Sequence, residues 1–404
     1  MPMSPDGAAI LYVGALPPES GGSPHVGGLL VAGLAERGHR VRAISPITAE
    51  AQQDGDAFAR AHPVLPVTRV VGPPPPVDDA RAEDAYRREQ SERFRRVVVV
   101  ELAGDRPDVL VASNTSMAVH LPALQAAYDV PCVLIVHGPT VLGMLAGTVP
   151  ADRDLLSGLR RTDRLVAVAP HLARALCRLG LDDSCVIENP VDVSRFAPGR
   201  KDPALMEALA VTREDLVVAH VSRLGSVKRP LDIVFSAEHA LRSNPRLLYL
   251  ILGDGPLRAP MQEACAQRGV TPRFRFVGRV DHAAVPAHLN LADVVVMPSE
   301  SEGQCLVYLE TQACGRVLLA SDIPAAVDVV IDGETGLLFR KGDIAHLAAK
   351  TLEAAADPDL RAAIGARARQ AAEAHSVDKV VTSYETLFRE AIARRDGGRR
   401  HPSG

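Results

Sequence analysis

The sequence predicts an α/β protein made of two Rossmann-like domains, and three observations support this fold class. The chain has 404 residues, more than a single ordinary hydrophobic core supports. Short apolar runs alternate with amphipathic stretches throughout, which is typical of parallel sheets with helices on both faces. The alternation breaks around 188–203, where Pro, Gly and charged residues replace the periodicity. We therefore expect one domain on each side of this break.

The first half follows the strand–turn–helix order of such a domain. A strand is expected at 8–14, followed by a glycine-rich turn and a helix at 24–38, with Ser23 as its N-cap and Gly38 at its end. Residues 72–79 form a proline-rich loop that precedes a charged helix. The other strands expected in this half lie at 40–45, 108–113, 132–138 and 164–169.

The second half repeats the pattern. Its expected strands lie within the segments "DLVVAHVS", "RLLYLILGDGP", "RFRFVGRV", "ADVVVMPSE", "RVLLAS" and "TGLLF", with helices between them. We predict domains at 1–192 and 193–375, followed at 376–404 by a helix that packs back on the first domain and by a disordered tail. Ligands bind such sheets at the carboxyl ends of the strands, so a cleft between the two facing domains is the expected site.

Composition excludes several classes of function. A net charge of −4 gives no nucleic-acid footprint, and 3% aromatic residues with no Trp argue against a base-stacking platform. No apolar run is long enough to span a membrane, and the N-terminus lacks the pattern of a signal peptide. The 6 Cys form no C-x-x-C pair, which predicts reduced thiols. We expect a cytoplasmic protein without a stable membrane anchor; homodimerisation stays open.

The stretch "SESEGQCLVYLETQACG" carries two carboxylates eight residues apart, Glu302 and Glu310. It follows an expected strand, and a helix should begin near Gln304 or Cys305, after the tight turn that Gly303 permits. The first amides of that helix favour an anion such as diphosphate. If the intervening residues are helical, Glu310 lies about 12 Å from Glu302 along the helix axis. The two carboxylates then suit hydroxyl groups on either side of a diphosphate. The alternative is that Glu310 is a solvated surface charge.

Two cations follow the first strand of the second half, in "HVSRLGSVKRP". Arg223 and Lys228 are predicted to lie at the carboxyl end of that strand, before a helix that begins near Pro230. Two fixed cations there are suited to neutralising a leaving nucleotide diphosphate. A solvated basic loop is the alternative. Lys228 is one of only five lysines in this Arg-rich chain, which favours the functional interpretation.

The first half offers weaker candidates. Gly21 and Gly22 open onto a helix and suit close approach to phosphate, but the segment is not the full G-x-G-x-x-G pattern. His25 is either a ligand group or a buried helix residue. His137 ends an expected strand and should face the cleft. The D-x-D at 54–56 is interpreted as surface, because no strand precedes it, and no Cys/His spacing indicates a metal site.

These motifs together resemble the family-4 glycosyltransferases of the GT-B fold. Retaining members of that family carry a Glu-x7-Glu motif, which "EGQCLVYLE" matches. "VSRLGSVKRP", "ENPVDVSRF", "LILGDGP" and "FVGRVD" match further blocks of the second half, and "GG…HV…LAERGHRV" matches the first half loosely. The sequence departs from the family at Gln304-Cys305, where Phe-Gly is usual. A Cys in place of the Gly narrows the space at the helix start.

The resemblance implies a role for each matching residue. Glu302 would contact the donor sugar, Glu310 the ribose, and Arg223 with Lys228 the diphosphate. His137 would lie beside the transferred sugar, so the implied catalytic set is Glu302, His137, Arg223 and Lys228. Gly303, Cys305, Leu306 and Val307 at the helix start would also belong to the donor site. Gly278, Arg279 and Val280 would border the nucleotide base, and Gly21 or Gly22 would approach the phosphate of the donor. It also implies an acceptor-binding first domain and a nucleotide-sugar-binding second domain.

The implied reaction transfers a sugar from a UDP- or GDP-sugar with retention, without a metal or other cofactor. Residues 1–192 hold 18 Arg and no Lys against 23 Asp plus Glu, a net of 18 − 23 = −5. The basic residues of 81–96 are interleaved with acidic ones, so no basic membrane-facing patch is predicted. We therefore expect a soluble small-molecule acceptor, such as a thiol, a cyclitol or a natural-product core. A membrane-lipid or polysaccharide acceptor, a nucleotide-sugar epimerase and a non-catalytic nucleotide-sugar binding protein remain as alternatives.

Overall fold

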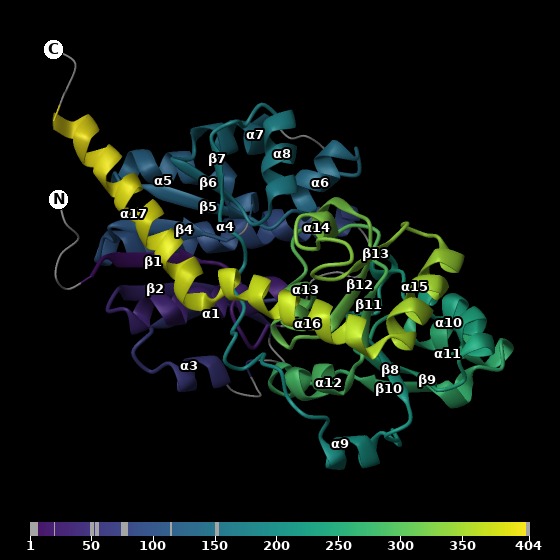
Figure 1. Cartoon of the computed structure of the whole chain (residues 1–404). Coiled ribbons are helices and arrows are strands. Elements are labelled where there is room, and N and C mark those ends of the chain that lie inside the picture. The colour runs from purple at the N-terminus through teal and green to yellow at the C-terminus, as the bar shows by residue number, and fades with distance from the viewer. Residues whose placement is uncertain are drawn as a thin grey trace. The chain divides into compact units, whose positions relative to one another are not determined.

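The computed structural model describes residues 7–19, 21–48, 52, 56–73, 80–113, 115–149 and 153–400. The chain forms two compact units, of which unit 1 comprises Met1–Pro190 with Val377–Gly404 and unit 2 comprises Val191–Ser376. Each unit contains one parallel sheet covered by helices (Figure 1). The sequence predicted boundaries after residues 192 and 375, and the structure divides the chain after Pro190 and after Ser376.

The sheet of unit 1 has strand order β3-β2-β1-β4-β5-β6-β7, and every pairing in it is parallel. Its strands are β1 (Ala9–Val13), β2 (Arg40–Thr48), β3 (Val67–Gly72), β4 (Val109–Ala112), β5 (Cys132–Val136), β6 (Arg164–Ala167) and β7 (Ser184–Val186). The helices described in this unit are α1 (Gly22–Glu36), α3 (Ala57–Ala61), α4 (Ala80–Gly104), α5 (Leu121–Tyr128), α6 (Pro139–Leu145), α7 (Arg153–Arg161), α8 (Pro170–Arg178) and α17 (Val377–Arg400).

The sheet of unit 2 has order β10-β9-β8-β11-β12-β13 and is also parallel. Its strands are β8 (Leu216–Val221), β9 (Leu247–Leu252), β10 (Phe274–Gly278), β11 (Val294–Met297), β12 (Val317–Ser321) and β13 (Leu337–Phe339). Its helices are α9 (Pro203–Ala208), α10 (Leu231–Ser243), α11 (Arg258–Gln267), α12 (Val285–Leu291), α13 (Leu306–Ala313), α14 (Pro324–Val327), α15 (Ile344–Ala356) and α16 (Pro358–Ala372).

Continuous apolar strands explain the two-faced burial of unit 2. Successive side chains of a strand point to opposite faces of the sheet. Along β8, Val217 and Ala219 therefore enter one apolar cluster while Val218 enters the other. The residues of β11 alternate in the same way, because Val295 and Val296 belong to different clusters. A sheet buried on both faces leaves the loops at the ends of its strands as the places where polar groups can gather.

The strand order of each sheet reverses beside its first strand, and this creates a crevice at the carboxyl edge. In unit 1 the crossovers leave in opposite directions from β1 and β4, and in unit 2 from β8 and β11. The loops that diverge from such neighbouring strands form the usual ligand site of an open α/β sheet. The residues 222–230 follow β8 and 298–305 follow β11, so the predicted charged motifs share one crevice.

Two strands and one helix cap differ from the sequence-based expectation. The strands β3 and β7 were not predicted, because both are edge strands with partly exposed side chains and weak alternation. The predicted N-cap Ser23 is wrong: Gly21 occupies the N-cap position of α1 with φ 122°, and Ser23 lies inside the first turn. That φ favours glycine over any residue with a side chain.

The C-terminal helix α17 belongs to unit 1. Its residues Val381, Tyr384 and Phe388 are buried in the core of that unit. Figure 1 shows α17 in yellow along unit 1, where it contacts α1, β4 and β5. Glu385 accepts a hydrogen bond from Arg37 at 2.8 Å and lies 3.0 Å from the imidazole Nε2 of His39. The helix extends to Arg400, and residues 401–404 of the predicted disordered tail lie outside the described residues.

Within the described ranges, no helix combines the length and the apolar character needed to cross a bilayer. Helix α4, which has 25 residues, carries charged side chains over much of its length.

Helix α17 packs closely against α1 at Gly33. A Cβ added at Gly33 would lie 2.8 Å from Val381 Cγ2 and 3.1 Å from Val377 Cγ1. Replacing Gly33 by leucine should therefore push α17 away and destabilise unit 1 by about 1–3 kcal/mol, as overpacking does. The measurement is thermal and urea unfolding followed by circular dichroism.

The matched control is Gly104→Leu, at an exposed position near the end of α4 with nothing within 4 Å of the added Cβ. This variant should unfold as the wild type does. Equal stability of Gly33→Leu and Gly104→Leu would contradict close packing of α17 on α1.

Candidate functional site

The loops that follow β8 and β11 carry an ion pair between two predicted site residues. Lys228 ends a 3₁₀ turn at Ser226–Lys228, and its Nζ lies 2.5 Å from Glu302 Oε1. The backbone ties the loops together as well, because the amide of Glu300 donates to the carbonyl of Val227 at 2.7 Å. The structure thus brings together two residues that lie 74 positions apart in the sequence.

A buried serine fixes the carboxylate. The hydroxyl of Ser299 donates to Glu302 Oε1 at 2.7 Å, and the hydroxyl of Ser321 donates to the carbonyl of Ser299 at 2.6 Å. Ser299 and Ser321 are fully buried. Sequence reasoning did not single out Ser299, although it opens the quoted stretch. Its position directly after a buried strand was the available signal.

Electrostatics keep Lys228 charged. Burial alone would lower the pKa of its ammonium, but the Glu302 carboxylate more than offsets that effect, so the pKa stands above its usual value. A charged ammonium, held at the carboxyl edge of the sheet by a carboxylate, can be shared with an anionic ligand.

The helix α13 begins where the sequence predicted. Cys305 is its N-cap, and Leu306 and Val307 form its first turn. Among the described residues, the amide of Tyr308 is the first in the helix with a backbone partner, the carbonyl of Cys305 at 3.1 Å. No backbone acceptor is found for the amides of Leu306 and Val307 in the described part of the chain, and amides at a helix start favour an anion. Burial, with a smaller contribution from Glu302, raises the pKa of the Cys305 thiol to about 12, so it stays neutral.

Glu310 is buried on α13, with 5% of its surface exposed. Its Oε1 lies 2.7 Å from His282 Nε2, at the 3₁₀ turn His282–Ala284 that follows β10. The ring of His282 lies beside that of Phe196, with 5.3 Å between centroids. The alternative interpretation of Glu310 as a solvated surface charge is therefore wrong. His282 was missed, since its approach to Glu310 depends on the order of β10 and α13 in space.

The remaining predicted site residues of unit 2 differ in how far they are exposed. Arg223 is exposed, and its side chain has no recorded hydrogen bond or ion pair with the part of the chain that the structure describes. Gly278 ends β10 with φ +81°, and an added Cβ would approach the guanidinium of Arg258 to 3.3 Å. Arg279 is exposed, and Val280 packs partly against the core.

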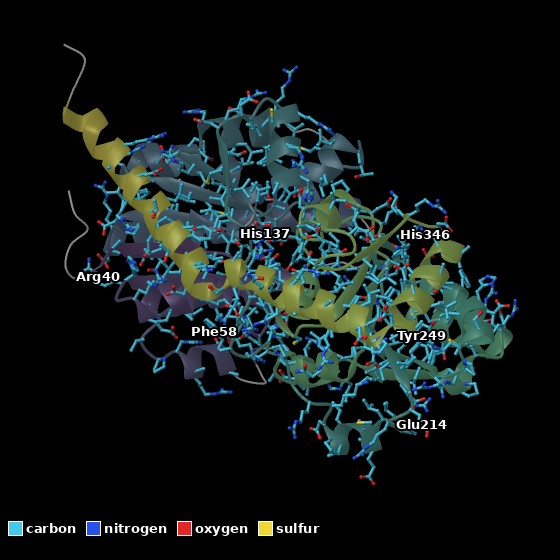
Figure 2. All side chains as sticks on the ribbon, in the orientation of Figure 1. Arg40, Phe58, His137, Glu214, Tyr249 and His346 are labelled. Atoms are coloured by element: carbon cyan, nitrogen blue, oxygen red, sulfur yellow. The ribbon has the colours of Figure 1, made fainter. Side chains whose placement is uncertain are left out.

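In unit 1, the predicted residues lie at the ends of β1 and β5. Gly21 caps α1 and Gly22 begins it, both exposed. His137 follows β5 (Figure 2), and its Nε2 lies 2.7 Å from the hydroxyl of Ser113, at the end of β4. Burial lowers the pKa of His137 to about 4, so its ring is neutral at pH 7. His25 is half-buried on α1.

A pocket of about 350 Å³ lies in unit 1 in front of His137. This is within the range of about 300–1,000 Å³ that small-molecule sites occupy. One wall comes from α4, through Tyr86, Gln90 and Phe94 at helical spacing. The rest comes from β2, from the start of α1 and from the segments that follow β1, β4 and β5, including Glu19 and Ser113. The sequence indicated His137 alone, because α4 reads as a charged helix and not as a pocket wall.

The D-x-D at 54–56 has a structural role at its last residue. Asp56 caps α3 by accepting from the amide of Ala59 at 3.0 Å, and it pairs with Arg69 at 2.6 Å. Asp54 and Gly55 lie outside the described residues. The interpretation of this segment as a surface element rather than a metal site fits these contacts.

Comparisons with known proteins cover both units. A family model described as "Glycosyltransferase Family 4" matches residues 20–195, and one described as "Glycosyl transferases group 1" matches residues 202–371. N-acetyl-alpha-D-glucosaminyl L-malate synthase of Bacillus anthracis is 26% identical over 93% of this chain and 95% of that protein. D-inositol 3-phosphate glycosyltransferase of Salinispora arenicola is 34% identical over 62% of this chain and 60% of that protein.

A solved structure gives the same fold. Sucrose-phosphate synthase of Thermosynechococcus elongatus superposes with a TM-score of 0.78 at 19% identity, covering 96% of this chain and 100% of that one. The two Rossmann-like domains expected from the sequence are thereby confirmed as the GT-B fold.

A buried histidine supports the Ser222 loop beneath the ion pair. His220 Nδ1 lies 2.8 Å from the carbonyl of Val296, and its Nε2 lies 2.7 Å from the hydroxyl of Ser222. Burial lowers the pKa of His220 to about 4. The unfolded chain binds a proton at this residue below about pH 6.5, whereas the folded chain does not until about pH 4.

The free energy of unfolding should therefore be highest above about pH 6.5 and should fall by about 3 kcal/mol towards pH 4 through this residue. His220→Asn should flatten that part of the profile, measured by urea unfolding at several pH values. His239→Asn, at an exposed position on α10, is the control and should keep the wild-type slope. An unchanged slope in His220→Asn would show that His220 is not the group that titrates.

Proposed function

Because this chain belongs to the family-4 glycosyltransferases with the GT-B fold, we propose that it transfers a sugar from a UDP- or GDP-sugar to a small-molecule acceptor with retention of anomeric configuration. The matches over both units support a glycosyltransferase that uses a nucleotide sugar. We propose in addition its stereochemistry, its acceptor class and the roles of its residues.

One observation carries the proposed mechanism: the contact between Lys228 and Glu302 at the carboxyl edge of the second sheet. The ammonium lies beside the start of α13, whose first amides have no backbone acceptor among the described residues. A diphosphate at that helix start would receive hydrogen bonds from the amides and charge from Lys228, with exposed Arg223 as the second cation. Fixed donors of this kind stabilise negative charge where it develops in a transition state.

The two carboxylates would hold the ends of the donor. Glu302 would accept from hydroxyls of the sugar, and Glu310 from the ribose, each in an orientation set by a neighbour. Ser299 and Lys228 orient Glu302, and His282 orients Glu310. Gly278 to Val280 would border the base through backbone groups. Gly21 or Gly22 would approach the phosphate from unit 1.

In the transfer step, the bond from the anomeric carbon to the diphosphate oxygen breaks as the acceptor nucleophile bonds to that carbon from the same face. The electron pair of the broken bond stays on the diphosphate, and the departing phosphate oxygen takes the proton of the acceptor. The protein therefore supplies charge and position rather than a base. His137, neutral at pH 7, would donate or accept a hydrogen bond beside the sugar. With Lys228, Arg223 and the amides as donors, the mechanism requires no metal.

A test of the function separates it from its alternatives. UDP and GDP are screened for binding by thermal shift, and the matching nucleotide sugars are then incubated with and without small acceptors. Transfer requires an acceptor and releases the nucleoside diphosphate. A sugar epimerised without an acceptor, or tight donor binding with no transfer to any acceptor, would reject the proposal in favour of an epimerase or a binding protein.

Removing the Lys228 charge should slow transfer strongly. We expect Lys228→Ala to lower kcat by about 10²–10³, the loss typical of removing one preorganised donor to a developing anion. Steady-state kinetics with the identified donor measure this loss, and circular dichroism checks the fold. Lys350→Ala is the control, since that lysine pairs with Glu353 on α15. Wild-type turnover in Lys228→Ala would remove Lys228 from the mechanism.

Glu310→Gln should act on binding more than on turnover. The amide keeps an oxygen for one hydrogen bond but loses the charge that strengthens contacts to vicinal hydroxyls, so KM for the donor should rise about tenfold or more. The change in kcat should be smaller, because the ribose lies away from the bond that breaks. Glu353→Gln serves as the control on α15. A large loss of kcat at constant KM would argue against a ribose contact.

A further inference from the structure

The pocket in front of His137 is lined by one negatively charged side chain, and this limits the ligands that it can bind. Among the side chains that line it in the described part of the chain, Glu19 alone carries a formal charge at pH 7. The other polar groups are neutral hydrogen-bonding groups, among them Ser113 and Thr140, and His137 is neutral as well. Glu19 is held in place, since its Oε1 accepts from the amide of Thr48 at 2.9 Å.

Two arginines, one on the neighbouring strand β3 and one on α4, are held by other partners. Arg69 pairs with Asp56 at 2.6 Å and also donates to the hydroxyl of Ser45 at 2.8 Å. Arg93 pairs with Glu89 at 2.7 Å and donates to the carbonyl of Val71. Neither lines the pocket. A phosphate or carboxylate placed against the wall formed by Glu19, Tyr86 and Gln90 would meet no cation among the described lining residues and would face the Glu19 carboxylate.

The wall of the pocket carries a buried amide with hydrogen-bonding capacity left over. Gln90 is only 3% exposed, and neither its Nε2 nor its Oε1 makes a hydrogen bond of good geometry with a described residue, although Tyr86 lies beside it. Gly72 leaves it room, because a Cβ there would approach Gln90 Nε2 to 2.5 Å. Leaving a buried amide unsatisfied is costly, and a ligand that both donates and accepts hydrogen bonds would recover that cost.

Glu19 also acts on the tyrosine of this wall. Burial, and then the negative charge of Glu19, raise the pKa of the Tyr86 hydroxyl. The phenol therefore stays a neutral donor and acceptor. The pocket thus offers several neutral hydrogen-bonding groups for hydroxyls and one carboxylate for a positive charge.

We propose that the acceptor is an amine-bearing polyol, such as an aminocyclitol or an amino sugar, whose ammonium pairs with Glu19 while its hydroxyls bond to Gln90 and the Ser113–His137 pair. This inference rests on the proposed function and specifies its acceptor. It separates this chain from two relatives named for the anionic molecules L-malate and inositol 3-phosphate, and it agrees with a third relative that is named for the aminocyclitol 2-deoxystreptamine.

The test compares three cyclitols that differ in charge. Isothermal titration of the full chain uses 2-deoxystreptamine, myo-inositol and myo-inositol 1-phosphate. The aminocyclitol should bind at least about tenfold tighter than the neutral one, which corresponds to one charge-assisted hydrogen bond, and the phosphate should bind most weakly.

The variant Glu19→Gln isolates the charge. Its amide oxygen can still accept from the Thr48 amide, so the loop should stay folded, while the advantage of the aminocyclitol over myo-inositol should fall about tenfold. Gln90→Leu should weaken all three cyclitols together. Glu36→Gln, at an exposed position on α1, is the matched control and should leave the ranking unchanged.

Three results would overturn the proposal: tightest binding of the phosphate, an amine preference that persists in Glu19→Gln, or no binding of the aminocyclitol. The function itself is judged separately. If UDP or GDP binds and sugar is transferred to another acceptor, only the acceptor class fails. If neither nucleotide binds, the proposed function fails as well.

Discussion

The ion pair between Lys228 and Glu302 is the constraint around which the second sheet's edge is organised. Bringing an ammonium and a carboxylate out of water costs free energy, and a pair is tolerated only when further hydrogen bonds satisfy it. Here the buried hydroxyl of Ser299 supplies one such bond, and Ser321 holds the backbone of Ser299 in turn. The chain of contacts runs from β12 through the loop after β11 to the loop after β8. The two loops consequently take a defined position before any ligand arrives.

The same pair explains how a site can hold both cations and carboxylates. A diphosphate needs positive charge, whereas the hydroxyls of a sugar are better served by an anion. Lys228 and Glu302 neutralise each other, so neither is left as an isolated buried charge. Glu310, within α13, lies 2.7 Å from His282 Nε2, so this buried carboxylate also has a hydrogen-bonding partner. The helix start between them stays neutral because the thiol of Cys305 is kept protonated by burial.

The two units differ in the charge of their polar edges. Unit 2 gathers Lys228, Arg223 and two carboxylates at the carboxyl ends of its strands. The corresponding edge of unit 1 is nearly neutral, with His137 uncharged and hydrogen-bonded to Ser113. Arginines of unit 1 form ion pairs of their own, as Arg69 does with Asp56 and, elsewhere in the unit, Arg37 does with Glu385. An Arg-rich composition therefore says little about the charge of a site, since ion pairing decides which guanidinium groups remain available.

The sequence by itself determined the fold class, most central strands and the helix start at Cys305, because buried parallel strands and glycine turns leave strong local patterns. It also identified Lys228, Glu302 and Glu310 as candidates. Tertiary structure decided what these residues contact. The pairing of Lys228 with Glu302 follows from β8 lying beside β11, an order that no local pattern encodes. The roles of Ser299 and His282, and the pocket wall formed by Tyr86 and Gln90, arise in the same way. Edge strands β3 and β7 escaped prediction because half-exposed strands need no regular alternation. Local physics thus specifies elements, and strand order in space specifies the site.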